Sequence, residues 1–199
     1  QVANNPYHHE RITTLVIKHD PDIKRIIKEC NCDEFIKIDD ICAIITGDVE
    51  EKDYLSDKVQ LLHSELDADR IDYLMRDATF SGTTYGGFEL GLLFDNLIAE
   101  KYDGVKIVGI RPKGIPSADQ FMLNRFFSYN QVIFNSHVSI LGLMAQKVIE
   151  FSISCGLLPS KEALINSIKS NDRKLFLSFT DFAFWSALKT LSENSYLTR

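Results

Sequence analysis

Apolar residues recur at helical spacing over most of this chain, and the longest such run lies between Tyr54 and Ala78. Its apolar positions are mostly three or four residues apart: Leu55, Val59, Leu62, Leu66, Ile71 and Leu74. This spacing places side chains on one face of an α-helix, where they can pack against a core. It predicts a long helix over residues 54–78, with a break before Asp67 as the alternative.

The remaining segments show the same helical pattern with one exception. Helices are expected over residues 7–29 (two, joined at Asp20-Pro21), 36–46, 88–100, 117–155, after Ser160, and over 174–191. Residues 105–111 are rich in β-branched residues and precede the turn Pro112-Lys113-Gly114, so a small β-hairpin is expected near residues 104–116. The predicted fold is mainly α, a helical bundle with one small hairpin.

Length and composition narrow the class of protein. The 199 residues suffice for one domain with a buried core, and no repeat or low-complexity linker divides them, so a single domain over residues 1–199 is expected. Hydrophobic residues make up 45% and charged residues 25%, a balance typical of soluble globular proteins. The sequence contains neither an apolar run of about 18 residues nor a signal-peptide pattern. We therefore expect a cytoplasmic protein that does not span a membrane.

The charge and the cysteines exclude further classes. The net charge of −6 argues against general nucleic-acid binding, which needs a surface that attracts phosphates. Four cysteines are too few for a disulfide framework in a chain of this length. Cys30 and Cys32 form a C-x-C pair that neither Cys42 nor Cys155 completes. Reduced structural thiols are expected, and a zinc site is the alternative.

The segment from Asp67 to Asp77 carries the residues best suited to chemistry. On a helix Asp69, Tyr73 and Asp77 stand at i, i+4 and i+8, with Arg76 beside them, whereas Ile71, Leu74 and Ala78 lie on another face. Such a polar face can bind a divalent cation and a phosphorylated sugar. The alternative is a solvated face held by salt bridges.

The residues from Ser64 to Asp77 read S-E-L-D-A-D-R-I-D-Y-L-M-R-D, and those from Ser81 to Leu90 read S-G-T-T-Y-G-G-F-E-L. The first string resembles the S-x-L-D-A-D-R-x-D-Y-L-x-R-D segment of HD-domain deoxynucleotide triphosphohydrolases, and the second resembles their T-G-x-x-Y-G-x-F-D-L segment. The resemblance implies that Asp69 is a metal ligand, that Tyr73 and Asp77 face the deoxyribose, and that Arg70 lies near the phosphates. It also implies a partial HD domain over about residues 1–100, followed by a helical extension over about 117–199.

Two further segments resemble the same family. His8-His9-Glu10-Arg11-Ile12-Thr13 is similar to its H-E-x-x-[ST] helix start, which implies that His9 donates a proton to the leaving oxygen and that Glu10 orients His9. Arg125 opens a string, R-F-F-S-Y-N-Q-V-I-F-N, that resembles the R-x-x-[ML]-x-x-x-V-Y-x-H helix, so Arg125 is expected to contact the triphosphate. Ile133 and Asn135 replace the family's Tyr and His, which leaves the substrate's identity open.

The metal site implied by the resemblance is incomplete in this chain. The family uses a His, a His-Asp pair and a distant Asp, and only the last has a counterpart here, Asp69. His19-Asp20 is rejected as the pair, because Pro21 biases Asp20 away from helix and because the pair should precede His9. We expect an upstream segment that supplies the missing ligands; the alternative is a degenerate relative that has lost catalysis.

The resemblance therefore predicts a metal-dependent phosphohydrolase that converts deoxynucleoside triphosphates to deoxynucleoside and triphosphate, with Mg, Mn, Fe or Zn as cofactor. The expected partner of the protein is a nucleotide substrate. The resemblance also implies a homo-oligomer, since relatives of this type commonly assemble as dimers or tetramers. Two alternatives stay open. One is an HD phosphohydrolase that acts on another nucleotide or phosphoester, and the other is a non-catalytic nucleotide-sensing or assembly module.

Overall fold

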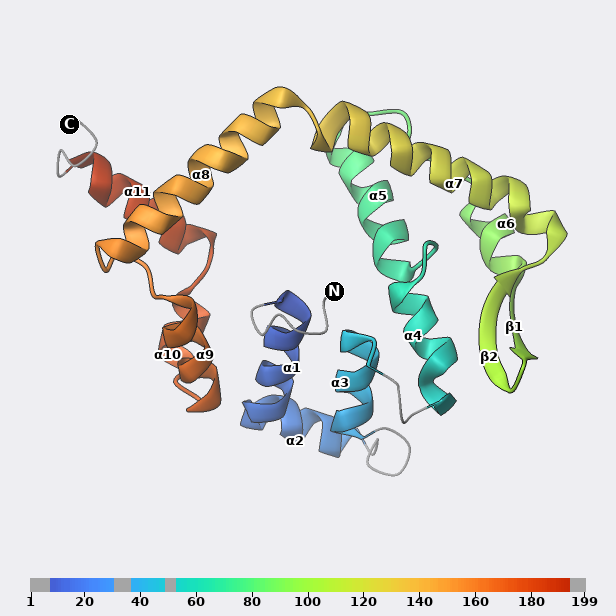
Figure 1. The fold of residues 1–199 in the computed structure, drawn as a ribbon, viewed down its shortest axis with the longest axis horizontal. Coiled ribbons are helices and arrows are strands. Elements are labelled where there is room, and N and C mark those ends of the chain that lie inside the picture. The colour runs from blue at the N-terminus through green and yellow to red at the C-terminus, as the bar shows by residue number, and fades with distance from the viewer. Residues whose placement is uncertain (1–7, 31–36, 49–52, 194–199) are drawn as a thin grey trace. The chain divides into compact units, whose positions relative to one another are not determined.

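The computed structural model describes residues 8–30, 37–48 and 53–193, and it is mainly helical with one small antiparallel sheet (Figure 1). The predicted fold class, mainly α with a small β-hairpin, is confirmed. The chain divides into two compact units, which we call the first unit (residues 1–42 and 140–199) and the second unit (residues 43–139). Each unit is described by itself below. The single domain expected over residues 1–199 stays a prediction.

The first unit consists of helices. They are α1 (His9–His19), α2 (Pro21–Glu29), most of α8 (Ser136–Ser154), α9 (Lys161–Lys169), α10 (Arg173–Ser178), α11 (Asp181–Glu193) and the first half of α3 (Ile38–Thr46). Helix α1 packs against α9, and α9 packs against α10. The expected single helix over 174–191 is wrong, because the chain breaks between Ser178 and Asp181 to form α10 and α11.

The predicted break at Asp20-Pro21 is confirmed. Asp20 has an extended backbone (φ −71°, ψ 120°) and is the N-cap of α2, where Pro21 occupies the first helical position. Its Oδ1 accepts hydrogen bonds from the backbone N–H of Asp22 at 2.8 Å and of Ile23 at 3.1 Å. The predicted N-cap at Ser160 is confirmed as well, since its hydroxyl accepts a hydrogen bond from the Ala163 N–H at 3.2 Å.

Asp20 also joins α2 to α10 through Arg173. The Arg173 guanidinium donates to both Asp20 carboxylate oxygens, at 2.9 and 2.8 Å from Nη2, and to Asp22 Oδ2 at 2.6 Å from Nη1. The hydrogen bond from Arg173 is the main reason that the pKa of Asp20 is lowered, and burial opposes it. The carboxylate thus has a structural role, since it ties the start of α2 to α10.

Substitution of Asp20 by asparagine is expected to lower the melting temperature at neutral pH by several degrees. Asparagine still caps α2 but cannot pair as an anion with Arg173. Since folding lowers the pKa of Asp20, its ionic contribution is present above the unfolded-state pKa near 3.8 and is lost as the pH falls through the lower folded-state value. The difference between parent and variant in thermal unfolding should therefore shrink below about pH 4.

Glu29→Gln is the matched control, because it removes an exposed pair of α2 with Arg25. It is expected to leave the melting temperature nearly unchanged. A melting difference for Asp20→Asn that stays constant down to the acid limit of folding would contradict the role of the ion pair.

The second unit contains short helices and a hairpin. Its elements are the rest of α3, a 3-10 turn (Asp53–Leu55), α4 (Ser56–His63), α5 (Ala68–Ser81), α6 (Leu90–Asp95), β1 (Leu97–Tyr102), β2 (Val105–Ile110), a 3-10 turn (Pro112–Gly114), α7 (Ile115–Ser128), a π-helical stretch (Tyr129–Ile133) and the first residues of α8. The alternative with a break before Asp67 is confirmed. Asp67 is the N-cap of α5, and its side chain accepts a hydrogen bond from the Arg70 N–H at 2.6 Å.

The β-hairpin begins earlier in the chain than expected. Strands β1 and β2 pair antiparallel from Leu97↔Ile110 to Tyr102↔Val105, so β2 lies within the expected range 104–116 and β1 precedes it. The helix expected over 88–100 ends at Asp95. Asp103 and Gly104 make the turn with positive φ values of 48° and 85°, a conformation that Asp and Gly adopt more readily than other residues. Cross-strand pairing therefore overrides the helical spacing of residues 96–100.

The core of the second unit lies where α5, α6 and α7 meet. Ile71 and Leu74 of α5, Leu93 of α6 and Phe121 of α7 form one buried cluster. The side chain of Asn124 on α7 donates a hydrogen bond to the Gly87 carbonyl at 2.9 Å, which fixes the loop between α5 and α6. This packing holds α5 against α7, and these two helices carry the candidate site.

Helix α7 and α8 are separate helices rather than the one expected over residues 117–155, because the π-helical stretch and Asn135 interrupt the α-helical hydrogen bonding. Over the residues that the structure describes, no single helix is long and apolar enough to cross a membrane. One broken pair, Pro112–Ile133 with Ser136–Ser154, reaches that length and apolar composition only when the two parts are taken together. Cys30, Cys42 and Cys155 form no disulfide, and Cys32 lies outside the described residues.

Candidate functional site

Helix α5 presents the two faces that the sequence predicts. Ile71, Leu74 and Ala78 are buried against the core, whereas Asp69 and Asp77 are exposed and Tyr73 is half-buried. On the exposed side Arg76 forms an ion pair with Asp72 at 2.5 Å. Asp69 and Asp77 are therefore accessible to a ligand, whereas Tyr73 packs partly against the core and Arg76 is already paired within the helix.

The Asp69 carboxylate has no hydrogen-bond or ion-pair partner among the described residues. It lies in the first turn of α5, where solvent reaches it. Such a carboxylate can offer an oxygen to a divalent cation, the ligand type that Mg²⁺ and Mn²⁺ prefer. A metal needs several ligands, however, and Asp69 belongs to no group of three His, Cys, Asp or Glu side chains that lie close together in the described chain.

Two arginines meet at one carboxylate beside this helix. Arg70 Nη1 donates a hydrogen bond to Glu65 Oε2 at 3.0 Å, and Arg125 Nη1, from α7, donates to the same oxygen. The Arg125 hydrogen bond and the Arg70 charge lower the pKa of Glu65, so the carboxyl is ionised at neutral pH. The structure thus places Arg125 next to Arg70 although 55 residues separate them in the chain.

Two tyrosines extend this arrangement. Tyr73 of α5 and Arg125 of α7 both lie near the side chain of Tyr129. The Arg125 guanidinium also lies 5.8 Å from the centre of the Tyr129 ring. Burial is the main reason that the pKa of Tyr73 is raised, and the neighbouring Tyr129 phenol adds to it. We call Glu65, Arg70, Tyr73, Arg125 and Tyr129 the arginine–tyrosine cluster.

Two members of this cluster, Glu65 and Tyr129, were not expected from the sequence. Tyr129 follows Arg125 by four residues, so the helical repeat signals that the two side chains are neighbours. Glu65 lies inside the string that carries the resemblance, but no local pattern links it to Arg125, 60 residues away. The packing of α7 against α5 brings them together.

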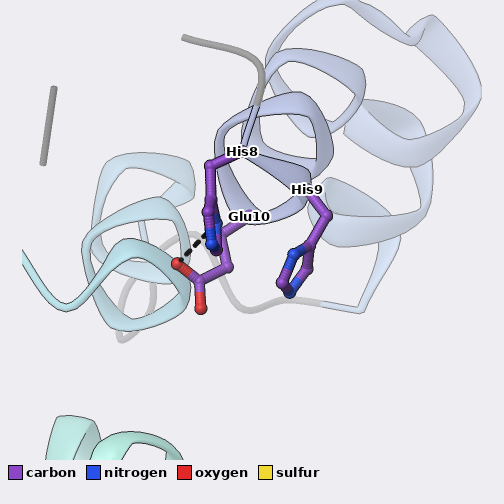
Figure 2. A group of neighbouring side chains, drawn as sticks. All are labelled: His8, His9 and Glu10. Carbon is purple, nitrogen blue, oxygen red and sulfur yellow. Dashed lines mark ion pairs between the residues drawn. The ribbon is translucent and has the colours of Figure 1, made fainter. Parts of the chain in front are cut away.

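The predicted residues of the first unit form a separate group at the start of α1. Figure 2 shows His8, His9 and Glu10, with the ion pair drawn between His8 and Glu10. His8 Nδ1 lies 3.3 Å from Glu10 Oε2, whereas His9 is exposed. The sequence predicts that Glu10 orients His9, but in the structure Glu10 pairs with His8 instead.

This group is the one place among the described residues where three His, Cys, Asp or Glu side chains could share a metal. Their ligand atoms lie within 4.8 Å of one another. All three belong to the first unit, whereas Asp69, Asp77 and the arginine–tyrosine cluster belong to the second. Within the second unit the structure brings Arg70, Tyr73 and Arg125 together.

Comparison with known proteins yields relatives without an assigned function. The chain is 31% identical over 124 residues to the uncharacterized MG461 homolog of Mycoplasma pneumoniae, a match that covers 62% of this chain and 28% of the relative. It is 28% identical over 203 residues to the uncharacterized protein MJ1154 of Methanocaldococcus jannaschii, covering the whole chain and 39% of that protein. The uncharacterized protein YwfO of Bacillus subtilis is 27% identical over 127 residues, or 64% of this chain and 27% of the relative.

No family model matches the chain. The chain spans between about a quarter and two fifths of the length of these curated relatives. The activity, substrates and partners of the whole protein are therefore addressed below as proposals.

Proposed function

We propose that the protein is a metal-dependent phosphohydrolase that cleaves deoxynucleoside triphosphates to deoxynucleoside and triphosphate. The observation that carries this proposal is the arginine–tyrosine cluster. Its residues lie just before α5, on α5 and at the end of α7, in the two second-unit segments that resemble HD-domain deoxynucleotide triphosphohydrolases. A site for phosphates and a site for a sugar thus adjoin each other there.

The two arginines are suited to the phosphates of the substrate. A guanidinium presents planar N–H donors that match the geometry of phosphate oxygens, and it keeps its charge at all accessible pH values. Arg125 is about one-fifth exposed and Arg70 about three-tenths, so both are partly shielded from water and still reachable. Both arginines donate to the same oxygen of Glu65, which supports the proposal that they can bind one anion together.

The tyrosines adjoin the arginines and suit the nucleoside. Tyr73 and Asp77 share a face of α5, and the Tyr129 side chain lies near Tyr73. Ile133 replaces the tyrosine of the family pattern, but Tyr129 stands one helical turn earlier and supplies a phenol to the same helix end. We assign sugar contacts to Tyr73 and Asp77, and we add Tyr129 as a neighbour of both sugar and phosphate.

In the second unit one residue, Asp69, is proposed as a ligand of the metal that the reaction needs. Asp69 fits, since it is an exposed carboxylate without a partner among the described residues, but one oxygen does not hold a divalent ion tightly. In HD-type hydrolases a bound divalent ion polarises the phosphoryl group and activates water. We propose that further ligands come from outside these 199 residues, and we keep His9 as the proton donor and Glu10 as its neighbour.

The intact protein should therefore release equimolar deoxynucleoside and tripolyphosphate from at least one deoxynucleoside triphosphate in the presence of Mg²⁺ or Mn²⁺. Chromatography of the products measures both. Release of orthophosphate or pyrophosphate instead would assign the protein to another class of phosphohydrolase. The absence of any product with all nucleotides and both metals would remove the enzymatic proposal. A cytoplasmic location and a homo-oligomeric assembly are part of the same proposal.

A non-catalytic nucleotide sensor is the second candidate. It is favoured by the arginine–tyrosine cluster itself, because two guanidiniums and two phenols can bind a nucleotide without a metal. Calorimetric titration of the intact protein with deoxynucleoside triphosphates in the presence of a chelator distinguishes the two. Tight nucleotide binding that does not depend on a divalent metal, without nucleotide turnover, would favour the sensor.

A further inference from the structure

We propose that Glu65 is an internal competitor for the phosphate-binding arginines, a carboxylate that occupies their anion position until a polyphosphate displaces it. This inference rests on the proposed function only in taking Arg70 and Arg125 as the phosphate-binding pair. It adds a residue and a form of regulation to that site. The ligand class is a molecule with several linked phosphate groups, either free polyphosphate or a nucleotide.

The contacts show that Glu65 stands where a phosphate oxygen would bind. One oxygen, Oε2, receives hydrogen bonds from both guanidiniums, one from α5 and one from α7. No other carboxylate is placed between the two arginines in the part of the second unit that the structure describes. A phosphate oxygen that bound both guanidiniums would need the same position.

The two arginines differ in how they are held. Arg70 is anchored independently of Glu65, since its Nη1 donates to the Ser64 carbonyl at 2.8 Å and its Nε lies 3.3 Å from Asp67. Asp67 is 3% exposed and caps α5, so it stays in place. Arg125 keeps its contacts with Tyr129. Both guanidiniums therefore remain in position when the Glu65 contacts break.

Glu65 itself is free to leave. Its side chain is 69% exposed, and it lies between the end of α4 at His63 and the start of α5 at Ala68, outside any helix. An exposed ion pair is weakly held, because water screens it and because ordering long side chains costs entropy. A polyphosphate with several negative charges attracts two guanidiniums more strongly than one carboxylate does.

Displacement of Glu65 still lowers the affinity of any ligand that takes both arginines. The ligand must break two existing ion pairs, and the displaced carboxylate remains nearby as a like charge. Removal of this charge should therefore tighten binding irrespective of base or sugar. The simplest probe is inorganic tripolyphosphate, which carries neither.

The test is calorimetric titration of the intact protein and its Glu65→Gln variant with tripolyphosphate at low ionic strength in a chelating buffer. Glutamine keeps the size of the side chain and removes its charge. We expect the dissociation constant to fall about threefold or more. Glu65→Asp is the second variant; its side chain is one methylene shorter and holds the two guanidiniums less well, so it should give a smaller gain.

Glu150→Gln is the matched control. It removes the same charge from an exposed carboxylate that pairs with Lys147 on α8, in the first unit, and it should leave the affinity unchanged. In an Arg125→Gln background the effect of Glu65→Gln should largely disappear, because only one of the two arginines remains. Equal or weaker binding by both Glu65 variants, compared with Glu150→Gln, would overturn the inference.

These outcomes separate the competitor from the proposed function. A gain in tripolyphosphate affinity without any nucleotide hydrolysis would support the role of Glu65 as a competitor and contradict the proposed enzymatic activity. Hydrolysis with no gain in tripolyphosphate affinity in either Glu65 variant would support the enzymatic activity and contradict the role of Glu65 as a competitor. The absence of tripolyphosphate binding in every variant would remove the phosphate site, and the competitor with it.

Discussion

Substitution of Asp69 by asparagine is expected to lower the turnover of deoxynucleoside triphosphates by the intact protein at least about 100-fold. Loss of a residue that only supports a metal ligand costs about 10- to 100-fold in affinity or activity, so loss of a ligand itself should reach or exceed that range. Asparagine has nearly the same size but a neutral oxygen, which binds a hard divalent cation more weakly. The loss should appear in both kcat and the affinity for Mn²⁺.

Asp72→Asn is the matched control on the same helix. Asp72 is an exposed carboxylate three residues further on, and it pairs with Arg76 within α5. Its loss should leave turnover within about twofold of the parent, because surface pairs of this kind contribute little. Tripolyphosphate binding without metal should be unchanged in both variants, since neither aspartate contacts Arg70 or Arg125. Equal turnover by the two variants would contradict the role of Asp69 as a ligand.

Substitution of Gly86 by alanine is expected to destabilise the second unit by about 2–3 kcal/mol or more. A methyl group on Gly86 would lie 2.1 Å from the Ala78 Cβ and 3.3 Å from the Leu74 carbonyl oxygen, both on α5. Neither atom belongs to the end of a flexible side chain, so the loop or the helix must move. Since α5 carries Arg70 and Tyr73 of the arginine–tyrosine cluster, we expect the variant to lose tripolyphosphate affinity along with stability.

Gly87→Ala is the control, because a methyl group there meets no atom within 4 Å. Denaturant unfolding monitored by circular dichroism compares the two variants. Ala78→Gly should partly rescue Gly86→Ala, since it removes the atom that clashes, although glycine within a helix itself costs about 1 kcal/mol. Equal stability of the Gly86 and Gly87 variants, or no coupling between positions 78 and 86, would contradict the close packing.

The local elements were predictable where a single physical effect dominates. Helix α5 follows from the period of Ile71, Leu74 and Ala78, and its start agrees with the alternative of a break before Asp67. The break at Asp20 follows from Pro21, which excludes helix at the preceding residue. Such signals act within a few residues, so the sequence alone contains them.

The errors occurred where distant residues decide the local structure. Residues 97–102 have a spacing compatible with helix, yet they form β1 because β2 supplies hydrogen-bond partners. The end of the predicted helix over 117–155 was missed because a π-helical stretch has no strong sequence signal. In each case tertiary context outweighed a weak intrinsic preference.

The candidate site divides in the same way. Because helical periodicity is a local property, the sequence alone predicts that Asp69, Tyr73 and Asp77 share one face of α5. The approach of Arg125 and Tyr129 to the other three cluster residues depends instead on the packing of α7 against α5, which no local pattern in the sequence predicts. Glu65 joins the two arginines because a carboxylate stabilises opposite charges that packing has placed within its reach.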